Sequence, residues 1–164
     1  LPRSRGLGDV YKRQGSNSRN AKAGKLHLDP DTVNLGVDRE GAFAEYLMMP
    51  ASNVVALPES VSNEVGSILD PFGNAVHATL SFDLVGEDVL ITGAGPIGIM
   101  SAAIAEHVGA RNVLISDIND ERLKLAQKVC NAETFNPTKE NLKEKMQSMG
   151  LKEGFDIGLS LIHI

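Results

Sequence analysis

The chain has 164 residues, of which 42% are hydrophobic and 23% charged, and its formal net charge at pH 7 is −5. This charge and the absence of Trp do not suggest a nucleic-acid partner, and no apolar run approaches the ~20 residues of a membrane-spanning helix. A single cysteine, Cys130, excludes a disulfide framework within this sequence. The composition predicts a globular, cytoplasmic protein with neither a nucleic-acid nor a membrane partner.

The two ends of the chain are related at the level of DNA. Residues Asp9–Gln14 can be encoded by GAT GTG TAT AAG AGA CAG, whose reverse complement translates as Leu-Ser-Leu-Ile-His-Ile, the sequence of residues 159–164. Read-through of a transposon-type sequencing adapter explains this better than two genuine termini do. We therefore expect residues 1–14 and 160–164 to be adapter read-through, and the remainder to be an internal piece of a longer protein.

Residues 15–80 begin as a polar, loop-rich stretch and continue with short apolar runs. Ala42–Met49 and Asn53–Leu57 are predicted as strands, and Ser60–Leu69 has the apolar spacing of a short helix.

The next helix is predicted to start at Asp70, because an Asp followed by Pro is typical of an N-cap. Asn74 and His77 follow on the same helical face. Capping is the favoured role of Asp70 on these residues alone, and a lone helical His is more often structural than functional.

The most informative stretch is an aliphatic run that ends in glycines spaced G-x-G-x-x-G, at Gly93, Gly95 and Gly98, before a predicted helix. Strand, tight turn and helix start are what the pyrophosphate of a dinucleotide requires. Gly93 would form the turn, Gly95 would let the backbone approach the phosphates, and Gly98 would let the helix pack on the strand. Free N–H groups at the helix start would face the anion.

An acidic residue, Asp117, follows the next apolar run at close to the roughly 20-residue spacing expected of the ribose-binding carboxylate. A carboxylate there accepts hydrogen bonds from both ribose hydroxyls and repels a 2′-phosphate, which favours NAD over NADP. A βαβ unit that binds nothing is the weaker alternative.

The remaining pattern predicts the first half of a doubly wound parallel sheet, an α/β fold. The predicted strands are 88–92, 112–116, 133–135 and one starting at 155–158, and the predicted helices are 96–108, 119–130 and 139–146.

Several motifs together resemble the zinc-type medium-chain alcohol dehydrogenases, from about Gly15 to Gly158. They are Arg-Glu-Gly-Ala-Phe-Ala-Glu-Tyr at residues 39–46, Asp70–His77, and Ser-Phe-Asp-Leu-Val-Gly-Glu-Asp at 81–88 together with the glycine turn. The resemblance implies two partial domains. Residues 15–80 would be part of a mostly β GroES-like catalytic domain, and residues 81–159 the first half of an NAD-binding Rossmann domain.

The resemblance also assigns roles to single residues. It implies that Asp70 is a catalytic carboxylate beside the catalytic zinc, that the backbone of Ile97 lies against the cofactor, and that Arg122 reaches the adenosine end of NAD. The alternative for Arg122 is a solvated ion pair with Glu121 or Asp120. The first zinc ligands of the family precede this segment, so we expect the chain alone to be inactive.

The structural zinc of the family is not expected in this chain. The four cysteine positions of that zinc lobe correspond to Gly15, Ser18, Ala21 and Asp29, which cannot build a Cys₄ site. We expect the lobe either to be looser than in related proteins or to be held by direct side-chain contacts.

As a function, the resemblance implies an NAD-dependent dehydrogenase that oxidises L-threonine, with zinc polarising the hydroxyl and NAD accepting the hydride, in a homotetramer. One alternative is oxidation of a polyol or another secondary alcohol. A second is a nucleotide-binding protein without catalysis, which the missing thiolates would suit.

Overall fold

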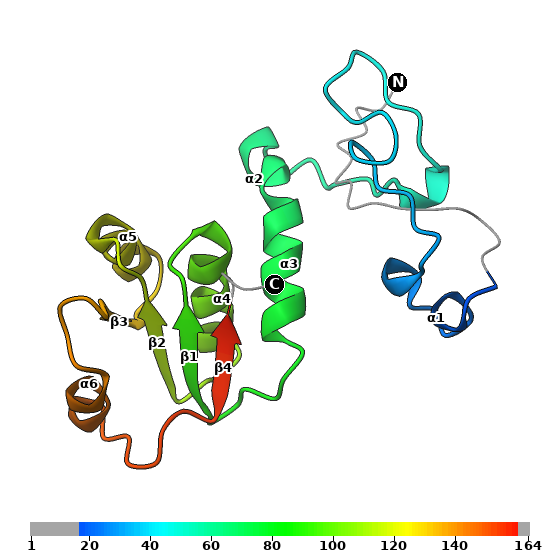
Figure 1. Ribbon diagram of the computed structural model, residues 1–164. Coiled ribbons are helices and arrows are strands. Elements are labelled where there is room, and N and C mark those ends of the chain that lie inside the picture. The colour runs from blue at the N-terminus through cyan, green and yellow to red at the C-terminus, as the bar shows by residue number, and fades with distance from the viewer. Residues whose placement is uncertain (1–16, 161–164) are drawn as a thin grey trace. The chain divides into compact units, whose positions relative to one another are not determined.

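A computed structural model of the chain describes residues 17–160, apart from the side chain of Ser52. The chain divides into two compact units, residues 1–70 and 71–164, each of which is described on its own (Figure 1). The expected adapter residues 1–14 and 161–164 lie outside the described part, whereas Ser160 belongs to the last strand. None of the described helices is long and apolar enough to cross a membrane.

The first unit consists of short helices and turns in its described part. They are α1 (Arg19–Lys22), the 3₁₀ turns η1 (Leu26–Leu28) and η2 (Ala51–Asn53), and α2 (Asn63–Ser67). The helix predicted within Ser60–Leu69 is thus confirmed. The strands predicted at 42–49 and 53–57 are wrong, because between residues 17 and 70 the only pairing is an isolated bridge from Leu35 to Arg39. A strand needs a neighbouring backbone, and here the side chains of Phe43 and Tyr46 are fully exposed instead.

Two of the positions that correspond to zinc-binding cysteines form hydrogen bonds inside this unit. Ser18 Oγ accepts a hydrogen bond from the N–H of Ala21 at 3.0 Å and caps α1. The buried Asp29 accepts one from the N–H of Asp31 at 3.1 Å through Oδ1. Both bonds span only two or three residues of the chain, so the expectation that the lobe is either looser or held by direct side-chain contacts stays a prediction. The lack of a structural zinc stays a prediction, and Gly15 lies outside the described residues.

The second unit is built on a parallel sheet whose strands follow the order β3-β2-β1-β4. The strands are β1 (Asp88–Thr92), β2 (Asn112–Ser116), β3 (Glu133–Phe135) and β4 (Ile157–Ser160). The limits predicted for β1, β2 and β3 are confirmed, and β4 begins two residues later than predicted. The α/β class of the fold is therefore confirmed.

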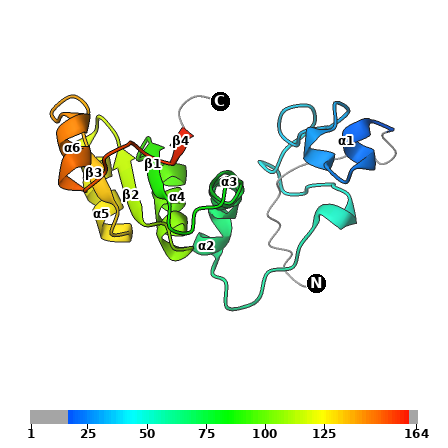
Figure 2. The same cartoon turned by 90° about the horizontal axis from the view of Figure 1, so that it is seen from below.

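The described part of this unit holds the helices α4 (Pro96–His107), α5 (Asp120–Val129) and α6 (Leu142–Ser148). Helix α3 (Leu69–Thr79) begins with the last two residues of the first unit and continues in the second. The crossovers from β1 to β2 and from β2 to β3 run the same way across the sheet, and the crossover from β3 to β4 runs back. Because such crossovers are right-handed, α4 and α5 cover one face of the sheet and α6 lies on the other (Figure 2).

The core lies between the sheet and the helices α4 and α5. Apolar side chains of β1 and β2, among them Ile91 and Ile115, pack with Ala102 of α4 and with Leu123 and Ala126 of α5. Full burial of one such aliphatic side chain stabilises the fold by about 2 kcal/mol. This packing fixes the carboxyl ends of the strands, where the candidate site lies.

Helix α3 starts one residue before its predicted N-cap. Asp70 is therefore the second residue of the helix and not its N-cap, so the predicted capping position is wrong. Only Ile68 separates the end of α2 from the start of α3. No residue with an extended backbone is therefore left to act as the N-cap of α3. A carboxylate in the first turn still interacts favourably with the positive end of the helix dipole.

Candidate nucleotide-binding site

A cleft of about 740 Å³ opens at the carboxyl ends of β1, β2 and β3. This is the edge at which open parallel sheets bind their ligands. All residues predicted to bind the cofactor line this cleft, namely Gly93, Gly95, Ile97, Gly98, Asp117 and Arg122. The structure therefore brings together residues that are spread over two βα connections in the sequence.

The turn after β1 depends on the first glycine of the motif. Gly93 has φ of 100°, in the left-handed region that favours glycine. Its N–H donates to the carbonyl of Ser116 at 2.7 Å, which ties the turn to the end of β2. The chain is thereby directed straight into α4.

The first turn of α4 presents backbone donors to the cleft. Gly95 is the N-cap and Pro96 the first helical residue, and Ile99 is the first residue whose N–H reaches a helical carbonyl, that of Gly95, at 2.9 Å. The N–H groups of Ile97 and Gly98 precede it and have no acceptor within the helix. Both residues line the cleft at the positive end of the helix dipole. The arrangement suits an anion.

Gly95 tests whether the cleft fits a pyrophosphate. Its φ of −74° and ψ of 178° are open to any residue, and a Cβ placed on it would meet nothing within 4 Å. Neither backbone strain nor packing of the chain requires glycine here. The lack of a side chain instead leaves room for a ligand to approach the backbone, as a dinucleotide requires.

Asp117 is the acidic residue of the cleft lining and follows directly after β2. Its side chain is buried, and its two carboxylate oxygens accept hydrogen bonds from the N–H groups of Ala94 and Asn119, each at 2.8 Å. Burial alone raises the pKa of Asp117, but these backbone donors and then Arg122 outweigh it and hold the pKa below its ordinary value. The carboxylate is therefore ionised at neutral pH and can accept hydrogen bonds from a ribose.

Arg122 lies beside this carboxylate, with Nη1 3.6 Å from Asp117 Oδ2. The two alternative partners of Arg122, Glu121 and Asp120, form ion pairs with other residues. Glu121 pairs with Lys124, and Asp120 pairs with Lys139. With 59% of its side chain exposed, Arg122 is free to turn toward a ligand in the cleft.

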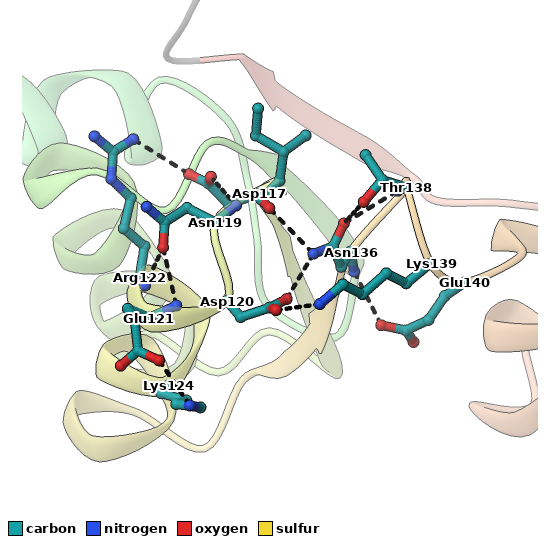
Figure 3. Close-up of polar contacts among 11 residues, drawn as sticks. Asp117, Asn119, Asp120, Glu121, Arg122, Lys124, Asn136, Thr138, Lys139 and Glu140 are labelled. Carbon is teal, nitrogen blue, oxygen red and sulfur yellow. Dashed lines mark hydrogen bonds and ion pairs between the residues drawn. The ribbon is translucent and has the colours of Figure 1, made fainter.

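A polar cluster behind the cleft was not predicted from the sequence (Figure 3). Asn136 is only 2% exposed, and its Nδ2 donates to the carbonyl of Ile118 at 3.2 Å and to Asp120 Oδ1 at 2.6 Å. Its Oδ1 accepts hydrogen bonds from the N–H and the hydroxyl of Thr138. The sequence contains one signal of this role, an Asn followed by Pro directly after a strand.

Asp70, the predicted catalytic carboxylate, is not among the residues that line the cleft. Asp70 is exposed on α3, as are Asn74 and His77. Between residues 17 and 160 no three His, Cys, Asp or Glu side chains are grouped so that they could hold a metal ion.

Comparisons with known proteins support the motif-based resemblance. The family model for zinc-binding dehydrogenases matches residues 96–162. An L-threonine 3-dehydrogenase of Ruegeria pomeroyi is 61% identical over 148 residues, which are 90% of this chain and 43% of that protein. One of Shewanella putrefaciens is 54% identical over 159 residues, 94% of this chain and 47% of that protein. The chain thus spans less than half the length of the curated relatives it matches.

Solved structures of dehydrogenases share the fold. A structure titled short chain alcohol dehydrogenase from Escherichia coli CFT073, complexed with NADH, superposes with a TM-score of 0.80 at 28% identity and covers 90% of this chain and 44% of that one. Galactitol-1-phosphate dehydrogenase of Escherichia coli gives 0.71 at 32% identity, over 81% and 38% of the two chains. The resemblance to zinc-type medium-chain dehydrogenases is confirmed.

Proposed function

We propose that this chain is the segment of a zinc-type, NAD-dependent L-threonine 3-dehydrogenase that holds the ADP half of the cofactor. The observation that carries the proposal is that the Asp117 carboxylate and the free N–H groups of α4 line one cleft. The identity of 54–61% to L-threonine 3-dehydrogenases supports threonine as the substrate. The polyol-phosphate dehydrogenase of known structure is more distant, at 32%.

In this proposal each wall of the cleft binds one part of NAD. The N–H groups of Ile97 and Gly98 hold the pyrophosphate, next to the space left by Gly95. Asp117 accepts hydrogen bonds from the ribose hydroxyls, and Arg122 lies against the adenosine. A 2′-phosphate would bring negative charge to the buried carboxylate of Asp117, so NAD is preferred over NADP.

The proposed reaction converts L-threonine and NAD⁺ into 2-amino-3-oxobutanoate, NADH and a proton. A zinc ion, when bound, lowers the pKa of the substrate hydroxyl, and its ligands are expected outside the described residues. The residues of this chain bind and orient the cofactor, and Asp70 is proposed as the catalytic carboxylate near the metal. A homotetramer in the cytoplasm remains part of the proposal.

Titration of the chain with NADH and NADPH tests the cofactor assignment. We expect NADH to bind more tightly than NADPH. The Asp117→Ala substitution should weaken NADH binding roughly 10- to 100-fold, because hydrogen bonds to a charged acceptor are lost. It should also reduce the ratio of the affinity for NADH to the affinity for NADPH. Asp83→Ala, at an exposed aspartate outside the cleft lining, is the matched control. Equal affinity for both nucleotides, or no binding by the unsubstituted chain, would overturn the assignment.

The substrate is tested on the longer protein that carries this segment. NADH formation should be much faster with L-threonine than with galactitol 1-phosphate. Asp70→Asn should lower kcat there while leaving the Kd for NADH unchanged. Faster turnover of the polyol phosphate would contradict threonine as the substrate, and an unchanged kcat would remove Asp70 from catalysis.

A further inference from the structure

The cleft has two loop walls that are far apart in the sequence. Ile118 and Arg122 come from the connection after β2 and the start of α5. On the other wall, Phe135 ends β3, Pro137 lies in the connection after it, and Leu142 begins α6. The width of the cleft at this end therefore depends on how the two connections are held against each other.

Asn136 is the residue that joins them. It lies between two lining residues, Phe135 and Pro137, but its own side chain is buried and bonded to the other connection, at the Ile118 carbonyl and the Asp120 carboxylate. Lys139 forms a second link by pairing with the same carboxylate (Figure 3).

The loop that carries Asn136 is itself ordered around this residue. The N–H of Asn136 donates to Glu140 Oε1 at 3.0 Å, and its carbonyl accepts from the N–H groups of Lys139 and Glu140, each at 3.0 Å. Thr138 holds the amide in place, since its hydroxyl donates to Asn136 Oδ1 at 2.7 Å. All hydrogen-bonding groups of the Asn136 amide and backbone are therefore used within the protein, and none is left for a ligand.

We propose that Asn136 is a positioning residue for nucleotide binding, which rests on the proposed function of the cleft. By joining the Ile118 carbonyl and Asp120 to the β3 connection, its side chain sets the separation of Ile118 and Pro137, the two walls at the adenosine end. Asn136 acts through these residues and does not touch the nucleotide.

The opposite edge of the sheet offers a matched control. Asn112, at the start of β2, donates through Nδ2 to Asp88 Oδ1 at 2.7 Å, the same amide-to-carboxylate bond that Asn136 makes to Asp120 at 2.6 Å. Asn112 does not line the cleft. Substitutions at Asn112 therefore remove an equivalent bond without moving the cleft walls.

The first experiment is a calorimetric titration of the full chain with NADH and with ADP-ribose, which lacks the nicotinamide. Asn136→Ala should raise the Kd of both probes about ten-fold, comparable to the loss of one hydrogen bond to a charged group. Asn112→Ala should leave both Kd values within two-fold of the unsubstituted chain. In the longer protein, Asn136→Ala should raise KM for NAD and leave kcat unchanged.

The second experiment uses Asn136→Asp, which keeps the shape of the side chain. The new carboxylate would face the carboxylates of Asp120 and Glu140 and the ammonium groups of Lys139 and Lys124, the charged groups around this cluster. Two adjacent carboxylates raise the pKa of one of them, and the protonated form can again donate to Asp120. The ratio of the variant Kd to the unsubstituted Kd should therefore be about ten at pH 8 and fall toward one near pH 5. Asn112→Asp should show no such change in ratio.

The possible outcomes separate the two proposals. If the unsubstituted chain binds neither NADH nor ADP-ribose, the proposed function fails. If it binds both and Asp117→Ala weakens binding as expected, but both Asn136 variants bind like the unsubstituted chain, only the role of Asn136 is refuted. An equal rise in Kd for Asn112→Ala and Asn136→Ala would show that the weaker binding comes from general destabilisation of the fold. That result would also overturn the positioning role of Asn136.

Discussion

A buried aspartate lies near an arginine at each end of the strands of the parallel sheet. The carboxylate oxygens of the two aspartates have different hydrogen-bond partners. At the amino edge, Asp88 accepts hydrogen bonds from Arg111 Nε at 2.8 Å, Arg111 Nη2 at 2.5 Å and Asn112 Nδ2 at 2.7 Å. At the carboxyl edge, Asp117 accepts from two backbone N–H groups, and Arg122 stands off at 3.6 Å.

This difference shows what makes one aspartate structural and the other available to a ligand. The Asp88 carboxylate is occupied by side chains whose geometry is bidentate, which suits a permanent contact. Asp117 is held by the backbone, and Arg122, its one side-chain partner within residues 17–160, lies 3.6 Å away in the lining of the cleft. The two arginines are equally exposed, at 59%. Their exposure therefore does not separate the two roles, whereas the geometry of their partners does.

The largest effect is expected from Asp88→Ala. The substitution removes the acceptor of three hydrogen bonds and should lower the free energy of unfolding by about 3 kcal/mol. The Kd for NADH of the folded chain should stay within two-fold, because Asp88 is at the far edge from the cleft. Urea unfolding followed by circular dichroism measures the change. A loss below 0.5 kcal/mol, the range of ordinary surface substitutions, would show that this network is not structural.

The two arginines give the sharpest paired comparison. Arg111→Ala should lower the urea midpoint and leave NADH binding unchanged. Arg122→Ala should leave the midpoint nearly unchanged and weaken NADH roughly three- to ten-fold, as loss of one side-chain contact does. Each variant is the control of the other. If both variants lower the urea midpoint, or both weaken NADH binding, the two ends of the strands do not differ in the way described above.

A smaller effect on the fold, but a clear one on binding, is expected at the glycine turn. Gly95→Ala should change the free energy of unfolding by no more than about 0.5 kcal/mol, since a Cβ there meets nothing within 4 Å. NADH should nevertheless bind at least roughly ten-fold more weakly, because the new side chain fills the approach to α4. Gly93→Ala should behave in the opposite way and cost about 1–2 kcal/mol of stability, since its φ of 100° strains any other residue. Comparable destabilisation by both variants would argue against a ligand space at Gly95.

The smallest expected effect is that of low pH on the free energy of unfolding. The hydrogen bonds from Arg111 lower the pKa of Asp88 despite its burial, and the pKa of Asp117 is lowered as well. A folded pKa below the ordinary value of 3.8 gives stability that is present above that pH and is lost as the pH falls through the folded pKa. The neighbouring carboxyl group of Asp156 instead raises the pKa of Glu87, so the contribution of Glu87 to stability is lost as the pH rises.

Unfolding measured at a series of pH values should therefore show stability falling below about pH 4. Asp88→Asn should flatten this decline, because the variant removes one of the titrating groups. An unchanged decline would assign the acid sensitivity to other carboxyls.

Most of the second unit could be predicted from the sequence because each element there has a local signal. β1 ends at a glycine turn, β2 is followed directly by Asp117, and Asn119 caps α5 by accepting from the N–H groups of Glu121 and Arg122. The start of β4 was misjudged because Asp156 is used as a side-chain acceptor for the N–H of Asp88 before the strand begins.

What could not be predicted depends on partners that are distant in the sequence. The run at 42–49 has the composition of a strand, but composition does not state whether a second backbone lies beside it. The contact of Asn136 with Asp120 likewise joins two connections through a side-chain direction that no spacing encodes. The positions of Gly93, Gly95, Gly98 and Asp117 in one cleft were predictable because βα units place such residues at the same edge of the sheet.

The order of the strands in the sheet has a consequence for folding during synthesis. Of the described strands, β4 is made after the other three, yet it pairs with β1, the earliest of them, so that Leu159 lies opposite Ile91. Every residue that lines the cleft, from Leu90 to Leu142, is synthesised before β4. Since domains form progressively as the chain leaves the ribosome, the cleft-forming strands can pair first. β4 then pairs with β1 through contacts of long sequence separation, which are the slow ones to form.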